Sequence, residues 1–345
     1  MKRVFVGLVA LLIFLSILEI GLRFSGKLKT YSEKSFNVYQ SPYAINANSQ
    51  IYKENPFDTI TINAIEYSYT YFMNNYGLND KQNLDTQNKE TTYLYLGDSF
   101  TFGAGTPQDS SVPALLSKIS NCTFINAGFS GSDPFFETKL IDSIFRPLGF
   151  EKFIIMMNVS DLYDYIFRGG TERFLPNGKL QFNKAPWWEK LHQHSYIVRA
   201  FAHGILKMDF TLLPPKIMKQ KKDEAVKEYA QLFIEKNKEL NGNLIVVIQP
   251  YARQYSNSNQ ILNEVMNFNY LLELNNNLKL NHIKTINLND SLSKIINDNN
   301  YLDYSCEIDG HYNSKGYFLL SQIIASELAK MNICQKDVAT TAYQN

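Results

Sequence analysis

Short runs of apolar residues alternate with segments of helical spacing from Thr91 to near the end of the chain. Five runs have the length and apolar character of strands: Tyr93–Leu96, Thr123–Asn126, Phe153–Met157, Leu244–Ile248 and Ile283–Leu288. Apolar residues recur at helical spacing in four segments: Val112–Ile119, Phe135–Ile144, Asp223–Leu240 and Tyr317–Leu328. Strands that are apolar along their whole length are typical of parallel sheets covered on both faces. The pattern predicts an α/β fold, a three-layer sandwich with a mostly parallel central sheet.

The rest of the chain does not follow this alternation. Residues 26–90 are rich in Asn, Ser, Tyr and Thr, and we expect an irregular extension there, with room for strands between Thr59 and Tyr71. Residues 165–240 interrupt the main domain with turn-rich sequence and one amphipathic helix, which indicates an insertion. The sequence thus predicts four parts: an apolar N-terminal segment (1–25), the extension (26–90), the main domain with its insertion (91–332) and a tail (333–345).

The N-terminal segment has the composition of a membrane anchor. Lys2 and Arg3 precede an apolar run of about 15 residues, Val4–Leu18, which is short of the ~20 that cross a bilayer. The span becomes long enough if it continues to Phe24 and Glu19 lies near the membrane surface. A signal peptide starts in the same way, but no small-residue cleavage motif follows, which favours an uncleaved anchor. Either way, we expect the rest of the chain outside the cytoplasm, in the periplasm or at the cell surface.

Composition and charge exclude several classes of function. The 345 residues are 45% hydrophobic and 19% charged, with a net charge of +1, so we expect no nucleic-acid partner. Cys122, Cys306 and Cys334 form no C-x-x-C pair and are odd in number, which argues against a cysteine metal site and a disulfide framework. One bridge is compatible with an oxidising compartment, and the sequence does not select its pair. The histidines of the insertion show no metal-ligand pattern and are expected to be structural: His192, His194 and His203.

The turn after the first predicted strand carries a candidate nucleophile. Leu96-Gly97-Asp98-Ser99 places Ser99 between the end of a strand and the start of a helix. Open α/β sheets place their sites at these carboxyl ends, where free backbone N–H groups can hold an oxyanion. A serine hydroxyl is a weak nucleophile and needs a base within hydrogen-bond reach.

A second segment, before the last predicted helix, supplies that base. His311 follows Asp309 by two positions in the stretch Ile308-Asp309-Gly310-His311. In a loop, Asp309 can orient the imidazole and stabilise its charged form, and Glu307 is the alternative partner. Since both segments lie at the ends of strand–helix units, we expect folding to bring Ser99 and His311 together.

These segments resemble the SGNH (GDSL) hydrolase superfamily, in its membrane-anchored extracytoplasmic form. Gly97-Asp98-Ser99 is similar to the first block of that family, and Asn126–Gly131 is similar to the second. Two further stretches, Asn74–Asn79 and Ile17–Arg23, resemble segments of extracytoplasmic members. The resemblance covers roughly residues 72–330 and implies a flavodoxin-like SGNH hydrolase fold after the N-terminal helix.

The resemblance also implies an oxyanion hole formed by the backbone N–H groups of Ser99 and Gly131. The third block of the family usually reads Gly-x-Asn-Asp, and its Asn completes the hole. Here the stretch is Asn158-Val159-Ser160-Asp161, so Ser160 occupies the Asn position. Either the Ser160 hydroxyl donates instead, or Asn158 reaches the site after a small shift of register. Losing one such donor costs on the order of 10²–10³ in rate, so a weakened hole predicts a slow or specialised enzyme.

We therefore predict a serine esterase or acylhydrolase that acts on an O-acyl ester of a cell-envelope glycan or lipid through an acyl-enzyme, without a cofactor. One alternative is an O-acyltransferase that modifies an envelope polysaccharide, because alginate-type O-acetyltransferases share the Asp-x-His spacing. Another is an inactive glycan-binding surface protein, because the third block is altered. In the insertion, Trp187 and Trp188 either contact a sugar ring or acyl chain, or simply pack.

Overall fold

The structure is a computed structural model, and it describes residues 2–26, 50–51, 53–209, 211–256 and 267–335. The chain divides into two compact units. Unit 1 is Met1–Asn48 with Ile166–Lys222, and unit 2 is Ser49–Tyr165 with Asp223–Asn345. Each is described by itself. The expected tail, 333–345, lies mostly outside the described residues.

Unit 2 is built on a five-stranded sheet whose pairs are all parallel. Its strands are β3 (Thr92–Gly97), β4 (Thr123–Gly128), β5 (Phe153–Met157), β6 (Leu244–Ile248) and β7 (Lys284–Asn287). They lie in the order β4-β3-β5-β6-β7. Counted within the sheet, this is the order 2-1-3-4-5 of flavodoxin-like folds. The prediction of an α/β fold with a parallel sheet is confirmed, and all five strands match the apolar runs.

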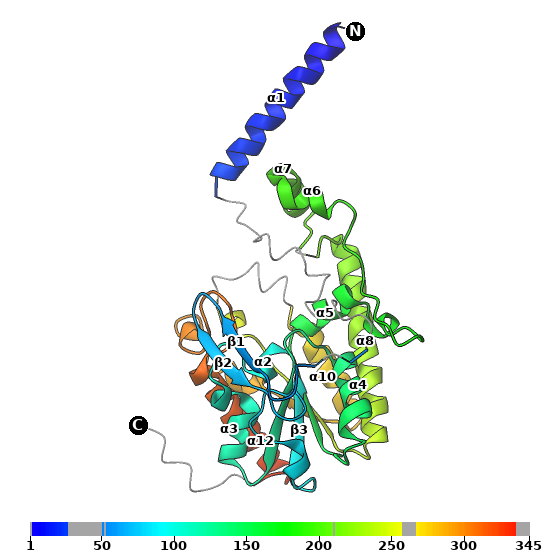
Figure 1. Cartoon of the computed structure of the whole chain (residues 1–345). Coiled ribbons are helices and arrows are strands. Elements are labelled where there is room, and N and C mark those ends of the chain that lie inside the picture. The colour runs from blue at the N-terminus through cyan, green and yellow to red at the C-terminus, as the bar shows by residue number, and fades with distance from the viewer. Residues whose placement is uncertain (1, 27–49, 52, 210, 257–266, 336–345) are drawn as a thin grey trace. The chain divides into compact units, whose positions relative to one another are not determined.

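Helices cover both faces of the sheet because the strands are apolar on both. Figure 1 shows α3 (Val112–Ile119) and α12 (Ser314–Lys330) on one side of β3. On the other side are α4 (Pro134–Leu140), α8 (Pro215–Glu239) and α10 (Asn269–Leu280). Alternate residues of each strand point to opposite faces, so Tyr95 packs toward α12.

Several helix boundaries differ from the sequence pattern. α8 begins at Pro215, eight residues before the predicted start, because a proline is well tolerated in the first turn of a helix. α4 ends at Leu140 and continues as a π-helical segment, Ile141–Phe145. The other α-helices in the described part of unit 2 are α2 (Ser99–Phe102), α5 (Ser160–Arg168, which extends into unit 1) and α11 (Asn289–Leu292). Single 3₁₀ turns cover Leu84–Thr86, Gln108–Ser110, Gly170–Arg173, Ala252–Tyr255 and Tyr301–Asp303.

The expected extension contains a β-hairpin, β1 (Thr59–Asn63) and β2 (Ser68–Phe72), paired antiparallel. Tyr71 of β2 is fully buried, and its hydroxyl donates to the carbonyls of Gly103 and Thr106. The hairpin is thereby packed on the segment that follows α2.

A disulfide joins Cys122, just before β4, to Cys334, after α12. It crosslinks positions that are 212 residues apart in the sequence. Cys306 is a free thiol, and burial raises its pKa to about 11.

Unit 1 contains the apolar N-terminal helix and the insertion. α1 (Lys2–Phe24) is the one described helix long and apolar enough to cross a membrane. The insertion carries two short helices, α6 (Glu189–His194) and α7 (Tyr196–Arg199), and then a π-helical segment, Ala200–Ile205. α7 contacts α1 through Glu19.

Candidate active site

Ser99 lies in a sharp turn between β3 and α2. Gly97 ends the strand with a φ of 150°, and a Cβ there would come within 2.2 Å of Thr101 Oγ1. The Asp98 carboxylate then accepts a hydrogen bond from the Phe100 N–H at 2.9 Å and caps the helix. The turn leaves Ser99 partly exposed between two buried neighbours.

The structure brings His311 to this serine. His311 Nε2 lies 2.7 Å from Ser99 Oγ, and its Nδ1 lies 2.9 Å from Asp309 Oδ2. Among the described residues, Asp309 and not Glu307 is the carboxylate hydrogen-bonded to His311. The side chains of His311 and Asp309 are 18% and 29% exposed, so solvent and small ligands reach both.

These groups lie where the connectivity of the sheet reverses. Ser99 follows β3, the first strand of the sheet in the sequence, and Ser160 follows its neighbour β5. In open α/β sheets this switch point, at the carboxyl ends of the strands, is where ligands bind. The position of Ser99 and His311 thus agrees with the general rule for this type of sheet.

The β-hairpin holds the loop of His311 from outside. The Glu66 carboxylate, in the hairpin turn, accepts hydrogen bonds from the backbone N–H groups of Glu307, Ile308 and Asp309 at 2.6, 2.8 and 2.8 Å. The neighbouring Tyr67 hydroxyl donates to Asp309 Oδ2. Neither Glu66 nor Tyr67 could be predicted from the sequence, because no local motif marks a contact between a turn and a loop so far along the chain.

Arg253 also binds the loop that carries His311. Its guanidinium donates to the backbone carbonyls of Cys306 and Glu307. The loop is closed by the bridge between Ser305 and Tyr312. The Asp309–His311 pair is therefore fixed by the hairpin, by Arg253 and by the loop itself.

The surroundings of Asp309 keep it charged. Burial alone would raise its pKa, but the hydrogen bond and charge of His311, the Tyr67 hydroxyl and Arg253 lower the pKa below its ordinary value. A carboxylate that stays ionised stabilises the positive imidazolium formed when His311 takes a proton.

Two backbone N–H groups are candidates for an oxyanion hole. Within the described residues, the N–H groups of Ser99 and Gly131 donate no hydrogen bond to the protein. Gly131 has a φ of 73°, a left-handed conformation that glycine adopts readily. Ser132, which follows it, donates its hydroxyl to the Gly97 carbonyl at 2.9 Å, which ties the Gly131 turn to the end of β3.

Asn158 and Ser160 both bind Asp98. Asn158 Nδ2 and Ser160 Oγ each lie 2.9 Å from Asp98 Oδ2. Asn158 is fully buried, whereas Ser160 is partly exposed. Ser160 also hydrogen-bonds Tyr251, whose pKa is raised by burial. Of the two residues, Ser160 is the one accessible to a bound ligand.

Two fully buried carboxyl groups lie behind the site. Burial raises the pKa of Glu137 and of Asp161 well above their ordinary values, and neighbouring carboxylates reinforce this. Glu137 Oε1 lies 2.8 Å from Ser132 Oγ, and Asp161 accepts a hydrogen bond from the Asn158 N–H at 2.7 Å. Both therefore support the turns that carry the candidate oxyanion donors.

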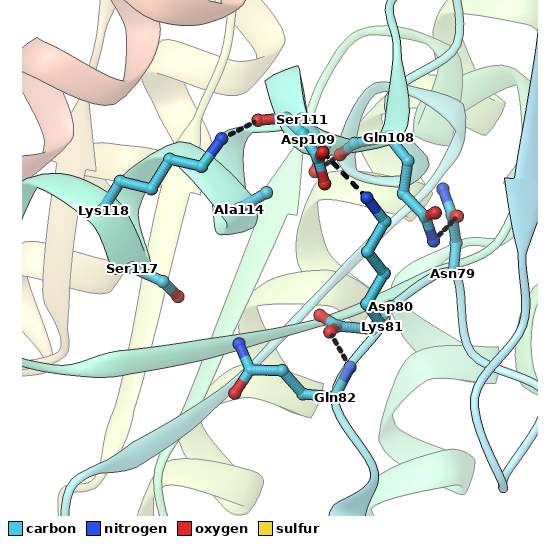
Figure 2. Close-up of a pocket in the computed structure, with 10 residues that line it drawn as sticks. All are labelled: Asn79, Asp80, Lys81, Gln82, Gln108, Asp109, Ser111, Ala114, Ser117 and Lys118. Carbon is cyan, nitrogen blue, oxygen red and sulfur yellow. Dashed lines mark hydrogen bonds and ion pairs between the residues drawn. The ribbon is translucent and has the colours of Figure 1, made fainter.

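A separate cavity of about 320 Å³ lies elsewhere on unit 2 and contains neither Ser99 nor His311 (Figure 2). Its polar walls come from two segments, 79–82 and 108–118. Lys81 pairs with Asp109 across it at 2.8 Å (Figure 2). Burial raises the pKa of Asp80 to about 6.

In the described part of the chain, no group of three or more His, Cys, Asp or Glu side chains could hold a metal ion.

Neither a family model nor a curated protein matches the sequence. Among solved structures, the chain is similar to a lipase/acylhydrolase from Enterococcus faecalis, with 12% identity and a TM-score of 0.42 over 70% of this chain and 96% of that one. It is also similar to Axe2, an acetylxylan esterase from Geobacillus stearothermophilus, with 14% identity and a TM-score of 0.41 over 69% and 94%. At such TM-scores we draw nothing about activity from either likeness.

Proposed function

We propose that the chain is a serine esterase or acylhydrolase of the SGNH (GDSL) type. The observation that carries the proposal is the hydrogen-bonded series Ser99–His311–Asp309, with distances of 2.7 and 2.9 Å. This is the arrangement that nucleophilic catalysis by serine requires: a hydroxyl, a base within reach and a third group that orients the base. The free N–H groups of Ser99 and Gly131 support it, since a developing oxyanion needs donors beside the nucleophile.

The reaction proceeds in two halves. His311 Nε2 takes the hydroxyl proton while Ser99 Oγ bonds to the acyl carbon, and the carbonyl oxygen becomes an oxyanion. The N–H groups of Ser99 and Gly131 stabilise it, and the Ser160 hydroxyl joins them by turning its single proton from Asp98 to the oxyanion. The bond to the alcohol oxygen then breaks, and that oxygen takes the proton from His311. Water, deprotonated by His311, then attacks the acyl carbon. The bond between that carbon and Ser99 Oγ breaks, Ser99 Oγ takes the proton back from His311, and the acid is released.

We further propose that this chemistry takes place outside the cytoplasm, on an ester of the cell envelope. α1 is largely apolar and begins with the positive residues Lys2 and Arg3, which favours an inside N-terminus. The Cys122–Cys334 disulfide supports an oxidising compartment. Hydrogen bonds from α7 to Glu19 favour retention of α1, because cleavage would remove a partner of the folded insertion.

The test is hydrolysis of short acyl esters by the full chain and by Ser99→Ala. Removal of a serine nucleophile costs on the order of 10⁶ in a serine protease, so we expect the variant to lose nearly all activity and all labelling by a fluorophosphonate. Ser293→Ala, at an exposed position just after α11, is the matched control and should behave as wild type. A Ser99→Ala enzyme that keeps most of the wild-type rate would refute the proposal. Wild-type protein that resists the probe yet binds glycans would instead indicate an inactive surface protein.

The second candidate is an O-acyltransferase, which the Asp-x-His loop favours. Alginate-type O-acetyltransferases share the two-residue spacing, and here Asp309 Oδ2 lies 2.9 Å from His311 Nδ1. The acyl-enzyme would then be resolved by a sugar hydroxyl instead of water. Supplying an acyl donor with and without an envelope polysaccharide, and weighing the products by mass spectrometry, separates the two functions.

A further inference from the structure

Glu19 is the one acidic residue in α1, and the insertion surrounds it with hydrogen-bond donors. Its carboxylate accepts hydrogen bonds from the Ser195 hydroxyl at 3.0 Å and from the backbone N–H groups of Tyr196 and Ile197 at 2.8 and 3.0 Å. Arg23 pairs with Glu19 at 3.0 Å and also donates to the His194 carbonyl. The start of α7 is thus fixed directly on the last part of α1.

The position of Glu19 in α1 sets the depth of these contacts. α1 has 23 residues, so it is about 35 Å long at ~1.5 Å per residue. The hydrocarbon core of a bilayer is ~30 Å thick. Glu19 precedes the end of α1 at Phe24 by about 8 Å along the axis. An inserted α1 therefore places Glu19 at the boundary between lipid tails and headgroups, and residues 195–197 must lie at the same depth.

The segment around these residues exposes large apolar side chains. Five of them lie within residues 187–206: Trp187, Leu191, Phe201, Ile205 and Leu206. Their exposed fractions run from 40% to 86%, the highest being that of Trp187. The described residues of unit 2, a much longer stretch, expose only eight such side chains. A concentration of exposed apolar groups marks an interaction surface.

The composition of residues 187–206 favours a lipid bilayer as the partner of this surface. Both tryptophans of the chain, Trp187 and Trp188, are here, and tryptophan is enriched at the membrane–water boundary. Lys190 inside the segment and Lys207 directly after it add positive charges that suit anionic headgroups. We propose that residues 187–206 lie in the headgroup region of the bilayer that α1 crosses, with Glu19 as the link. The insertion is then a second membrane contact, which fixes how unit 1 is held at the surface. This inference rests on the proposed anchoring by α1.

Because both tryptophans lie in the segment, the emission of the intact protein reports on it alone. The full chain is reconstituted into phosphatidylcholine–phosphatidylglycerol vesicles that contain lipids brominated either near the carbonyl or deep in the acyl chain. We expect a blue-shifted emission that is quenched, most strongly by the shallow bromines. Flotation with the vesicles measures membrane anchoring by α1 separately. Hydrolysis of a soluble ester measures the proposed esterase activity.

Glu19→Leu tests the link, since it removes the acceptor and makes α1 more apolar. We expect this variant to float with vesicles as wild type does but to lose quenching. Glu172→Leu, an exposed glutamate of the same unit, is the control and should keep it. The inference is overturned if the wild-type chain floats and its emission is not quenched, or if it does not float at all. Emission that responds to a soluble glycan or to self-association, and not to bromolipid, also overturns it.

Discussion

The backbone N–H of Asp309 donates a 2.8 Å hydrogen bond to Glu66, although 243 residues separate the two in the sequence. Glu66 lies in the turn of a hairpin outside the sheet, yet it fixes three successive N–H groups of the loop that presents His311. The loop has no regular secondary structure of its own at these positions. Its order therefore depends on a residue that belongs to none of the family blocks.

Replacement of Glu66 by Gln should loosen this loop. We expect kcat to fall by roughly 10-fold, less than the 10²-fold that a 1 Å displacement of a catalytic group can cost. KM for a small ester should be unchanged. The amides of residues 307–309 should exchange hydrogen faster, as measured by mass spectrometry. Glu151→Gln, at an exposed site, should change neither quantity.

The same contact should depend on pH. Burial would raise the pKa of Glu66, but its three N–H donors lower it more, so the net pKa is below the ordinary value. A carboxylate with a lowered pKa in the folded state stabilises it above the ordinary value and loses that effect as the pH falls through the folded pKa. Protection of 307–309, corrected for intrinsic exchange, should therefore decline in wild type below pH ~4. A Glu66→Gln variant with the same decline would contradict this explanation.

Asn158 and Ser160 should affect different properties. Ser160→Ala should lower kcat by roughly 10²-fold, the order expected for one oxyanion donor, and should lower the free energy of unfolding less than Asn158→Ala does, because Ser160 is partly exposed. Asn158→Ala removes a buried partner of Asp98 and should lower the free energy of unfolding by about 1–3 kcal/mol. Steady-state kinetics and urea denaturation measure the two effects. The reverse outcome would assign the oxyanion role to Asn158.

Glu137→Gln should flatten the dependence of stability on pH. Burial raises the pKa of Glu137, so its contribution is complete below the ordinary glutamate pKa and is lost as the pH rises through the raised one. Wild type should therefore lose stability relative to the variant as the pH increases from acidic to alkaline. Thermal unfolding at a series of pH values checks this. The control Glu151→Gln should show the same dependence of stability on pH as wild type. If stability changes with pH in parallel for wild type and Glu137→Gln, the explanation is wrong.

Removal of the Cys122–Cys334 disulfide should destabilise unit 2. The bridge closes a loop of 212 residues in the unfolded chain, and we expect Cys334→Ser to cost about 2–4 kcal/mol. Cys306→Ser, at the free thiol, should have a much smaller effect. Denaturation with and without a reductant measures the difference. If the reductant has no effect on wild type, the bridge does not contribute.

The sheet could be predicted because each strand is apolar along its whole length, so burial on both faces is visible locally. The proximity of Ser99 and His311 could be predicted because parallel strands bring their carboxyl ends to one edge. Both inferences use only the order of elements along the chain and the geometry of parallel sheets.

The hairpin contact could not be predicted, because Glu66 has nothing around it that distinguishes it from any exposed glutamate in a turn. The same holds for the choice between Asn158 and Ser160, which depends on side-chain directions around Asp98. The Cys122–Cys334 disulfide could not be predicted either, because three cysteines allow three pairings and only the folded structure shows which two are adjacent. In each case a side chain contacts a residue far away in the sequence, and neither segment has a sequence pattern that predicts the contact.

Glu66 lies in the first quarter of the sequence and the His311 loop in the last, so the ribosome synthesises them at different times. With 243 residues between Glu66 and Asp309 and synthesis at ~5–20 residues per second, roughly 12–50 seconds pass before the second follows the first out of the ribosome. For most of that interval Ser99 is already translated, whereas His311 and its loop are not. The Ser99–His311 pair therefore forms only after nearly the whole chain has been synthesised, so the proposed activity would be absent from every shorter nascent chain.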